Sequence, residues 1–307
     1  MRQLSVCLLF TVLLLAAGCR NKTALDANGV PYKLVVAVYE GDNPGETSGV
    51  LKKVKAYLER KLAIPVEFQE STDYTTIIEA MVAGKAHMAY LSPFSYILAT
   101  QKQRLVPLAA PGFHGKPFSY KSYIFTNPGT GLHSMEDVKA RSHQLTLCFA
   151  DPASTSGHLV PRSYLTTIGL DPKTAFKQTM FAGTHAASLL SVKAGKVDLG
   201  CAFQFAYDKM LRDGSLKPGE LIVLWESGPI PESPVCMRPE VSPAFTQKVK
   251  EAFLRMPQDG PEAFHAYMSM YFPKQADSLS YISVDDTLFD GLRKIATSIG
   301  DLTPTKK

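Results

Sequence analysis

Three hydroxyl residues and a glycine, Ser154-Thr155-Ser156-Gly157, follow an apolar stretch over residues 144–150 and precede a helical pattern. Backbone N–H groups at the start of a helix lack partners inside the helix, and the helix dipole makes that end positive. Hydroxyl groups placed there either cap the helix or donate to an anion, and a glycine lets a ligand approach the backbone closely. The pattern therefore predicts either a simple helix cap or an anion-binding turn.

A second candidate donor is His185, which follows Gly183-Thr184 and opens a helix expected over residues 185–194. Its ring N–H can donate to the same anion, or it can bond a backbone carbonyl. Hydroxyl, amide and imidazole groups together satisfy a tetrahedral oxyanion without burying several full cations. An alternative chemistry uses Ser154 or Ser156 as a nucleophile with His185 as base. No GxSxG motif accompanies these residues, so we expect no enzyme.

Strands and helices alternate in two series along the chain, and this pattern predicts parallel sheets covered by helices. Helical spacing predicts helices that begin near Thr47 or Ser48, at Tyr74 and at Pro93, and further helices over 156–168, 185–194 and 204–212. Strands are expected over residues 34–39, 66–69, 88–91, 106–110 and 122–126, and then over 144–150, 178–182, 197–203 and 221–226.

Two such series predict an α/β protein with two lobes, each a mostly parallel sheet flanked by helices. Residues 33–124 with 230–307 are expected to form lobe 1, and residues 125–229 lobe 2. Helices expected over 242–256 and 260–272 would pack back on lobe 1, so the chain would cross twice between the lobes, near 123–127 and 224–234. The two crossings would form a hinge, and the carboxyl ends of the strands, where ligands bind in such sheets, would face the cleft.

Residues 1–18 have the features of a signal peptide, with Arg2 followed by an apolar stretch too short to span a bilayer. This stretch ends in Leu15-Ala16-Ala17-Gly18-Cys19, which resembles the bacterial lipobox, where the cysteine is lipidated and becomes the first residue. Residues 19–32 would then be a lipidated tether. The alternative is an ordinary secretory peptide cut near Ala17-Gly18. Both place the mature chain outside the cytoplasm, and whether a lipid anchor enters the inner or the outer membrane stays open.

The formal net charge is +5 over 307 residues, and it becomes +4 without Arg2. No Lys/Arg run of the kind that binds nucleic acid is present. Three cysteines follow residue 19, namely Cys148, Cys201 and Cys236. We expect buried thiols, although a Cys148–Cys201 disulfide stays open. The Cys and His spacings predict no metal site, and we expect no cofactor.

Over residues 34–272 the chain resembles the solute-binding proteins of phosphonate, phosphite and phosphate ABC importers. The motifs that carry this resemblance are Asp73-Tyr74, residues 89–96, Asp151–Gly157, Phe181-Ala182-Gly183-Thr184-His185 and Gly195-Lys196-Val197-Asp198. It implies a two-lobe, type II periplasmic-binding-protein fold, a monomer, a small phosphorus oxyanion as ligand, and an ABC permease of the inner membrane as partner. Docking on a receptor kinase or chemoreceptor is the alternative.

The resemblance also implies which residues bind the ligand. Ser154, Thr155, Ser156 and His185 would hold the oxyanion, while Tyr74 and Tyr120 would close over it. Further candidates are Tyr90 and Ser92, at a strand-to-helix corner, and Asp208, where the family often carries an acid near the substituent of the ligand. Packing inside the core is the alternative for the tyrosines, and an exposed surface position is the alternative for Asp208.

The chain departs from the family pattern at Ala186. Aminophosphonate binders of this family carry a carboxylate directly after the site histidine, where it pairs with the ammonium group of the ligand. Without that carboxylate, a buried ammonium group has no obvious partner, which is costly. The sequence therefore favours phosphite, methylphosphonate or phosphate over 2-aminoethylphosphonate.

The lipobox generates a direct prediction. Cys19→Ser should abolish lipid labelling and release the protein in soluble form, because no thiol would remain at the processing site. Metabolic labelling with a fatty acid, followed by fractionation, measures both. Membrane attachment that persists in the variant would reject the lipoprotein interpretation.

Overall fold

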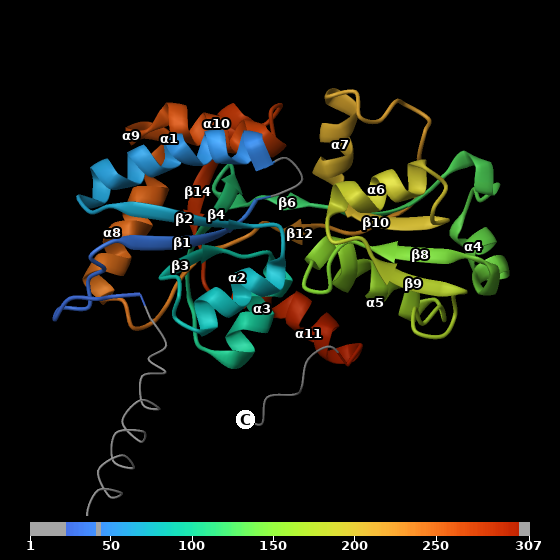
Figure 1. The fold of residues 1–307 in the computed structure, drawn as a ribbon, viewed down its shortest axis with the longest axis horizontal. Coiled ribbons are helices and arrows are strands. Elements are labelled where there is room, and N and C mark those ends of the chain that lie inside the picture. The colour runs from blue at the N-terminus through green and yellow to red at the C-terminus, as the bar shows by residue number, and fades with distance from the viewer. Residues whose placement is uncertain (1–22, 41–43, 301–307) are drawn as a thin grey trace, which may run out of the picture.

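The computed structural model describes residues 23–40 and 44–300. The expected signal peptide and Cys19 lie outside these residues. Within them, no helix is both long and apolar enough to cross a membrane. Figure 1 shows two sheets that lie side by side along the long axis of the molecule, each covered by helices.

The first sheet has seven strands in the order β14-β4-β13-β3-β1-β2, with β5 paired to β4. Its strands are β1 (Leu34–Tyr39), β2 (Val66–Ser71), β3 (Met88–Tyr90), β4 (Val106–Phe113), β5 (Lys116–Pro117), β13 (Val235–Met237) and β14 (Leu279–Ser283). On one side of it Figure 1 places α1 (Pro44–Leu62), α9 (Met256–Asp259) and α10 (Pro261–Tyr271), and α8 (Pro243–Leu254) packs against α1. Below lie α2 (Tyr74–Val82), α3 (Pro93–Lys102) and α11 (Asp290–Ser298).

The second sheet has five strands in the order β11-β7-β10-β8-β9. They are β7 (Ser122–Thr126), β8 (Thr146–Phe149), β9 (Gln178–Phe181), β10 (Leu199–Phe203) and β11 (Ile222–Glu226). Its helices are α4 (Met135–Arg141), α5 (Val160–Thr167), α6 (His185–Lys193) and α7 (Gln204–Arg212), and a π-helical turn over Thr155–Leu159 leads into α5. Short 3-10 turns lie at Pro128–Thr130, Ser142–Gln144, Ala276–Ser278 and Asp286–Phe289.

Both sheets are mixed: the expected parallel strands are present in each, and antiparallel strands join them. In the first sheet only β1 pairs in parallel, with β2 and β3, because helices connect these three strands. The strands β13 and β14, which sequence patterns missed, pair antiparallel with their neighbours, as does β5. In the second sheet β7 runs antiparallel to both β10 and β11. The strands β5, β7 and β13 each follow the preceding strand with no helix between them, so nothing imposes a parallel direction on them.

A two-stranded antiparallel sheet lies between the two main sheets in Figure 1 and consists of β6 (Ser119–Tyr120) and β12 (Ile230–Pro231). The strand β6 leads into β7, and β11 leads into β12, so both chain crossings occur at this point. Since β7 lies wholly in the second sheet, the boundary expected between residues 124 and 125 falls inside this strand.

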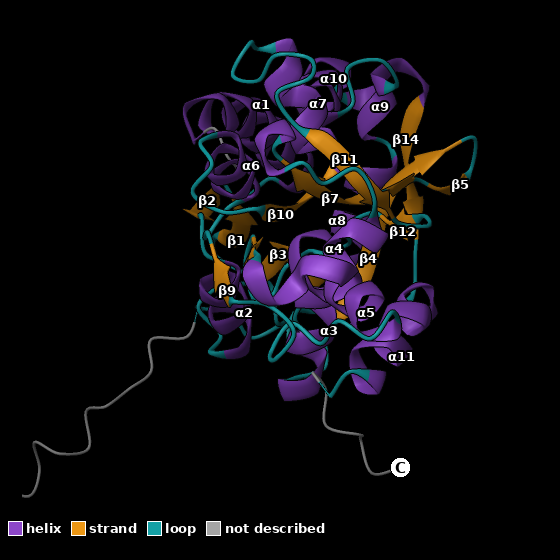
Figure 2. Ribbon diagram, turned by 90° about the vertical axis from the view of Figure 1, so that its right-hand side faces the viewer, coloured by secondary structure: helices purple, strands orange, loops and turns teal. Residues whose placement is uncertain are grey.

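The end of the chain also reaches the second half. Helix α11 packs against both α3 and α5, and the Arg162 Nη2 donates to the Ile299 carbonyl at 3.3 Å. Figure 2 shows α11 beside α5 below the second sheet. The segment after residue 234 therefore packs on the first sheet, as expected, and also contacts the second half.

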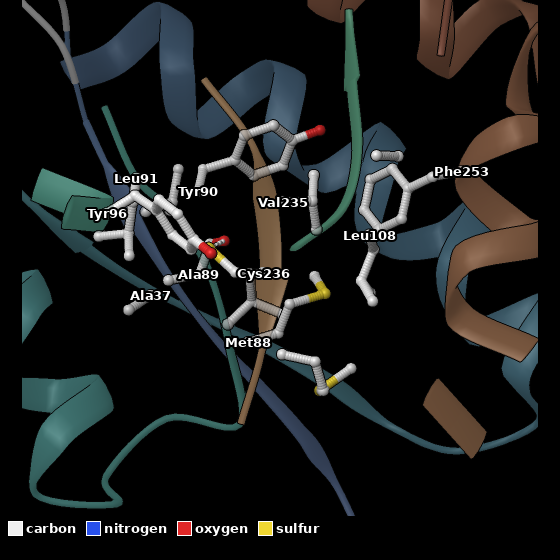
Figure 3. Close-up of a cluster of buried hydrophobic side chains, with 14 of the residues drawn as sticks. Ala37, Met88, Ala89, Tyr90, Leu91, Tyr96, Leu108, Val235, Cys236 and Phe253 are labelled. Carbon is white, nitrogen blue, oxygen red and sulfur yellow. Dashed lines mark hydrogen bonds between the residues drawn. The ribbon is translucent and has the colours of Figure 1, made fainter. Parts of the chain in front are cut away.

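The core of the first sheet is built from apolar side chains that its strands share with the helices (Figure 3). Met88, Cys236 and Phe253 are completely buried there. Tyr96 is buried as well, and its hydroxyl donates to the Asp286 carboxylate at 2.7 Å. Burial on both faces explains why the central strands are apolar throughout rather than alternating.

All three cysteines of the described residues are free and buried. Cys148 lies opposite Gly200 in the β8–β10 register, so the next residue, Cys201, points to the other face of the sheet. Accordingly Cys201 packs with Leu147 on one face, and Cys148 packs with Ala202 on the other. The sheet itself thus keeps the two thiols apart, which resolves the open question of a disulfide.

Candidate anion-binding site

A small cavity lies between the two halves, and both contribute to its lining. Its volume is about 120 Å³, well below the about 300–1,000 Å³ typical of pockets for drug-sized ligands. Eight of the nine candidate ligand-binding residues line it: Tyr74, Tyr90, Ser92, Tyr120, Ser154, Thr155, Ser156 and His185. Among the described residues that line it, none is a lysine or an arginine.

The turn over 154–157 forms directly after β8. Its start is fixed by Asp151, whose Oδ1 accepts from the Ala153 amide at 2.7 Å. The Ser154 Oγ then accepts from the Gly157 amide at 3.0 Å and caps the π-helical turn. Ser154 is therefore a helix cap, and because its oxygen serves as the acceptor, its own hydroxyl proton remains available to donate.

The first half contacts this turn through the start of α3. The Thr155 Oγ1 accepts from the Phe94 amide at 2.8 Å, and the Ser95 Oγ donates to the Ala153 carbonyl at 2.9 Å. Ser92 caps α3 by accepting from the Ser95 amide at 3.2 Å, and it also donates to the Ala153 carbonyl at 3.3 Å. Hydrogen bonds thus join the two halves at one edge of the cavity.

His185 is the first residue of α6, which Thr184 caps by accepting from the Ala187 amide at 3.0 Å. The His185 Nδ1 accepts from the Phe203 amide at 3.3 Å. We therefore assign the proton of the neutral ring to Nε2. This nitrogen lies 3.5 Å from the Tyr74 hydroxyl, which comes from the first half. The Tyr74 ring stacks on Tyr39, with centroids 4.2 Å apart.

The other two tyrosines differ in what their hydroxyls contact. Burial raises the pKa of Tyr120 and the side chains of Thr155 and Ser156 oppose this shift, so its hydroxyl lies near the turn. The Tyr90 hydroxyl pairs with the hydroxyl of Tyr281 instead. Burial raises the pKa of both tyrosines, so both are neutral near pH 7.

The structure places Asp208 outside this cavity. It lies on α7 near Tyr123 and Tyr207, and its charge contributes to raising the pKa of both. Burial raises the pKa of Asp208 itself. A helix position alone does not show which neighbour a side chain faces. Asp208 is a partly buried residue of α7 and does not line the cavity.

The ligand preference inferred from Ala186 stays a prediction. Ala186 lines a different hollow, beside Lys209 and Glu46, which form an ion pair of 2.9 Å between the two halves. The cavity does hold a carboxyl group, that of Glu232, which follows β12. Sequence reasoning missed it because charged residues in Pro- and Gly-rich stretches are usually exposed. Its position at a chain crossing is the signal that could have found it.

Glu232 is only 8% exposed. Its Oε2 accepts from the Ser233 amide at 3.0 Å. Burial raises its pKa to about 7, and the hydrogen bonds with Ser233 only partly oppose this shift. Near neutral pH this carboxyl group is therefore present in both protonation states.

Gly157 has a structural role that the sequence did not indicate. A Cβ at this position would lie 2.5 Å from the Ala150 Cβ, 2.9 Å from the His185 Cε1 and 2.9 Å from the Ser154 Oγ. The glycine lets the turn, β8 and α6 approach one another closely. This contact, more than access for a ligand, accounts for glycine here.

A family model described as "ABC transporter, phosphonate, periplasmic substrate-binding protein" matches residues 37–279. The chain belongs to this family. Its members bind a solute for transport and are not enzymes, which excludes the serine-nucleophile alternative. Membership also places the protein outside the cytoplasm.

Relatives of the phosphonate-binding family agree. The chain is 30% identical to the phosphate-import protein PhnD of Mycolicibacterium smegmatis over 256 residues, which are 79% of this chain and 78% of that one. It is 29% identical to the phosphonates-binding periplasmic protein of Escherichia coli over 64% of this chain and 58% of that one.

Solved structures show the same fold. A binding protein component of an ABC phosphonate transporter from Pseudomonas aeruginosa matches with a TM-score of 0.76 at 20% identity, covering 89% of this chain and 90% of the other. PhnD1 from Prochlorococcus marinus, in complex with methylphosphonate, matches with a TM-score of 0.74 at 16% identity, covering 88% and 99%. The fold is the two-lobe, type II periplasmic-binding-protein fold.

The close contacts at Gly157 predict that Gly157→Ala destabilises the protein. The added methyl group must displace Ala150, the His185 ring or the Ser154 hydroxyl, and overpacking of this kind costs about 1–3 kcal/mol. Urea unfolding measures the loss. Gly291→Ala, on the exposed side of α11 with nothing near its Cβ position, is the matched control and should not lose stability. Equal stability of both variants would contradict this account of Gly157.

Proposed function

We propose that this protein is an extracytoplasmic solute-binding lipoprotein that captures a small phosphorus oxyanion in the cavity between its two lobes. The ligand would be a phosphonate, phosphite or phosphate, and the protein would deliver it to an ABC permease of the inner membrane. The observation that carries this proposal is the set of hydroxyl and imidazole donors from residues 154–156 and His185 around one small buried cavity. Family membership supports the class of ligand.

The hydrogen bonds at the cavity suit an anion. Ser154 and Thr155 each accept from a backbone amide, so each can donate its own proton toward the cavity. His185 accepts from the Phe203 amide in the same manner, which leaves Nε2–H as its donor. Protein amides thus orient the donors before the ligand arrives, and two helix starts, at α3 and α6, add their positive ends.

Binding between the halves also supports coupling of capture to closure. Donors from the second lobe meet Tyr74 and the start of α3 from the first lobe. An anion held from both sides favours the arrangement in which the lobes touch, because only that arrangement provides all the donors. The closed form is then the form that we propose docks on the permease.

Anchoring through Cys19 and residues 19–32 would keep the protein near that permease. We propose lobe boundaries near residues 122 and 230, at β7 and β12. A monomer suffices for this function, since the whole cavity is lined by one chain.

Removing any one of three donors should weaken binding. Ser154→Ala, Thr155→Val and His185→Ala each take a hydrogen bond from a buried anion, and such bonds contribute about 1.5–3 kcal/mol. The dissociation constant should therefore rise roughly tenfold to a hundredfold. Isothermal titration calorimetry with phosphate, phosphite and methylphosphonate measures this.

Two matched variants control for the chemistry of the substitutions. Thr167→Val and His143→Ala make the same changes at exposed positions and should bind as the wild type does. Unchanged affinity in all three site variants would show that the anion binds elsewhere.

A further inference from the structure

The carboxyl group of Glu232 enters the cavity from the hinge. The Glu232 amide donates to the Phe118 carbonyl at 3.0 Å, which continues the pairing of β12 with β6. This bond places Glu232 opposite Phe118, two residues before Tyr120, and the Tyr120 hydroxyl lies near Thr155 and Ser156. Glu232 therefore borders the same cavity as the proposed anion donors, on its hinge side.

Three tyrosines lie near Glu232, and a fourth lines the same cavity. They are Tyr90 from β3, Tyr120 from β6, Tyr267 from α10 and Tyr281 from β14. Burial raises the pKa of all four, and the charge of Glu232 adds to this for Tyr120, Tyr267 and Tyr281. They are neutral groups, so none of them forms an ion pair with Glu232.

The other titratable groups that line the cavity are Tyr39, Tyr74 and His185. Among residues 23–40 and 44–300, no lysine, arginine or histidine forms an ion pair with Glu232. An ionised Glu232 would therefore share this cavity with a bound anion without a cation between them.

Two like charges in a small buried cavity repel each other, and neither an ionised carboxylate nor a fully ionised oxyanion can donate a hydrogen bond. A single proton between them reduces the repulsion and supplies the hydrogen-bond donor that is otherwise missing. We propose that Glu232 contacts the ligand and shares one proton with the bound oxyanion, so that the site takes up its anion together with that proton. This inference rests on the proposed function.

The proton comes from solvent or arrives on the ligand, and the complex holds one shared proton in both cases. Since the pKa of Glu232 is about 7 without ligand, the group is already protonated at lower pH, and affinity should change little there. At higher pH the complex must acquire the proton, so affinity should fall by up to tenfold per pH unit. At high pH the ionised carboxyl group would also weaken the binding of anions that carry no proton.

The test compares the wild type with Glu232→Gln, which keeps the shape of the side chain and supplies an N–H donor that does not titrate. Glu226→Gln is the matched control, because Glu226 is an exposed carboxylate on β11 that pairs with Lys121. Calorimetry with phosphate and methylphosphonate from pH 6 to pH 9, in buffers of different ionisation enthalpy, gives both affinity and proton uptake.

Above pH 7 we expect the slope of log Kd against pH to be greater by about one in the wild type than in Glu232→Gln. Proton uptake should likewise be greater by about one, and Glu226→Gln should behave as the wild type does. The ligand and His185 are the same in both proteins, so the difference in slope and in proton uptake between the two proteins removes their contributions.

Equal slopes and equal proton uptake in the two proteins would overturn the inference while leaving the proposed function standing. So would a wild type that binds 2-aminoethylphosphonate most tightly and loses that preference in Glu232→Gln, because Glu232 would then pair with an ammonium group. Failure of the wild type to bind any of these anions at any pH would refute the proposed function, and this inference with it.

Discussion

In the function that we propose, an anion removed from water must receive hydrogen bonds from groups that are already in place. Backbone amides meet this requirement here indirectly. The Gly157, Phe94 and Phe203 amides donate to Ser154, Thr155 and His185, and thereby fix which way those side chains donate. The donors are neutral, so their burial costs less than burial of lysine or arginine would. A site of this kind is ordered by the fold before any ligand binds.

The same bonds explain why the two lobes must act together. Thr155 belongs to the second lobe but accepts from an amide of α3 in the first, and Tyr74 of the first lobe meets His185 of the second. The strands β6 and β12 carry Tyr120 and lead directly to Glu232, so both chain crossings border the cavity.

Much of this could be predicted from sequence where the signal is local. Ser154, Thr155, Ser156 and His185 stand at helix starts directly after strands, and such positions can be recognised from neighbouring residues alone. The strands β13 and β14 and the mixed direction of both sheets could not, because they depend on where the chain returns after leaving a sheet. Asp208 lies outside the cavity, and this could not be predicted because a helical pattern does not show which neighbours a side chain faces. Glu232 was missed because only the tertiary structure buries it, and Ala186 lines a different hollow.

The central claim is that the anion sits between the lobes, held by the 154–156 turn and His185. A crystal structure of the protein with bound methylphosphonate tests this most directly. The account predicts density for the phosphonate oxygens within hydrogen-bond distance, about 2.5–3.2 Å, of the Ser154 and Thr155 hydroxyls and the His185 Nε2. Density for the ligand at any other place, with this cavity filled only by water, would contradict it.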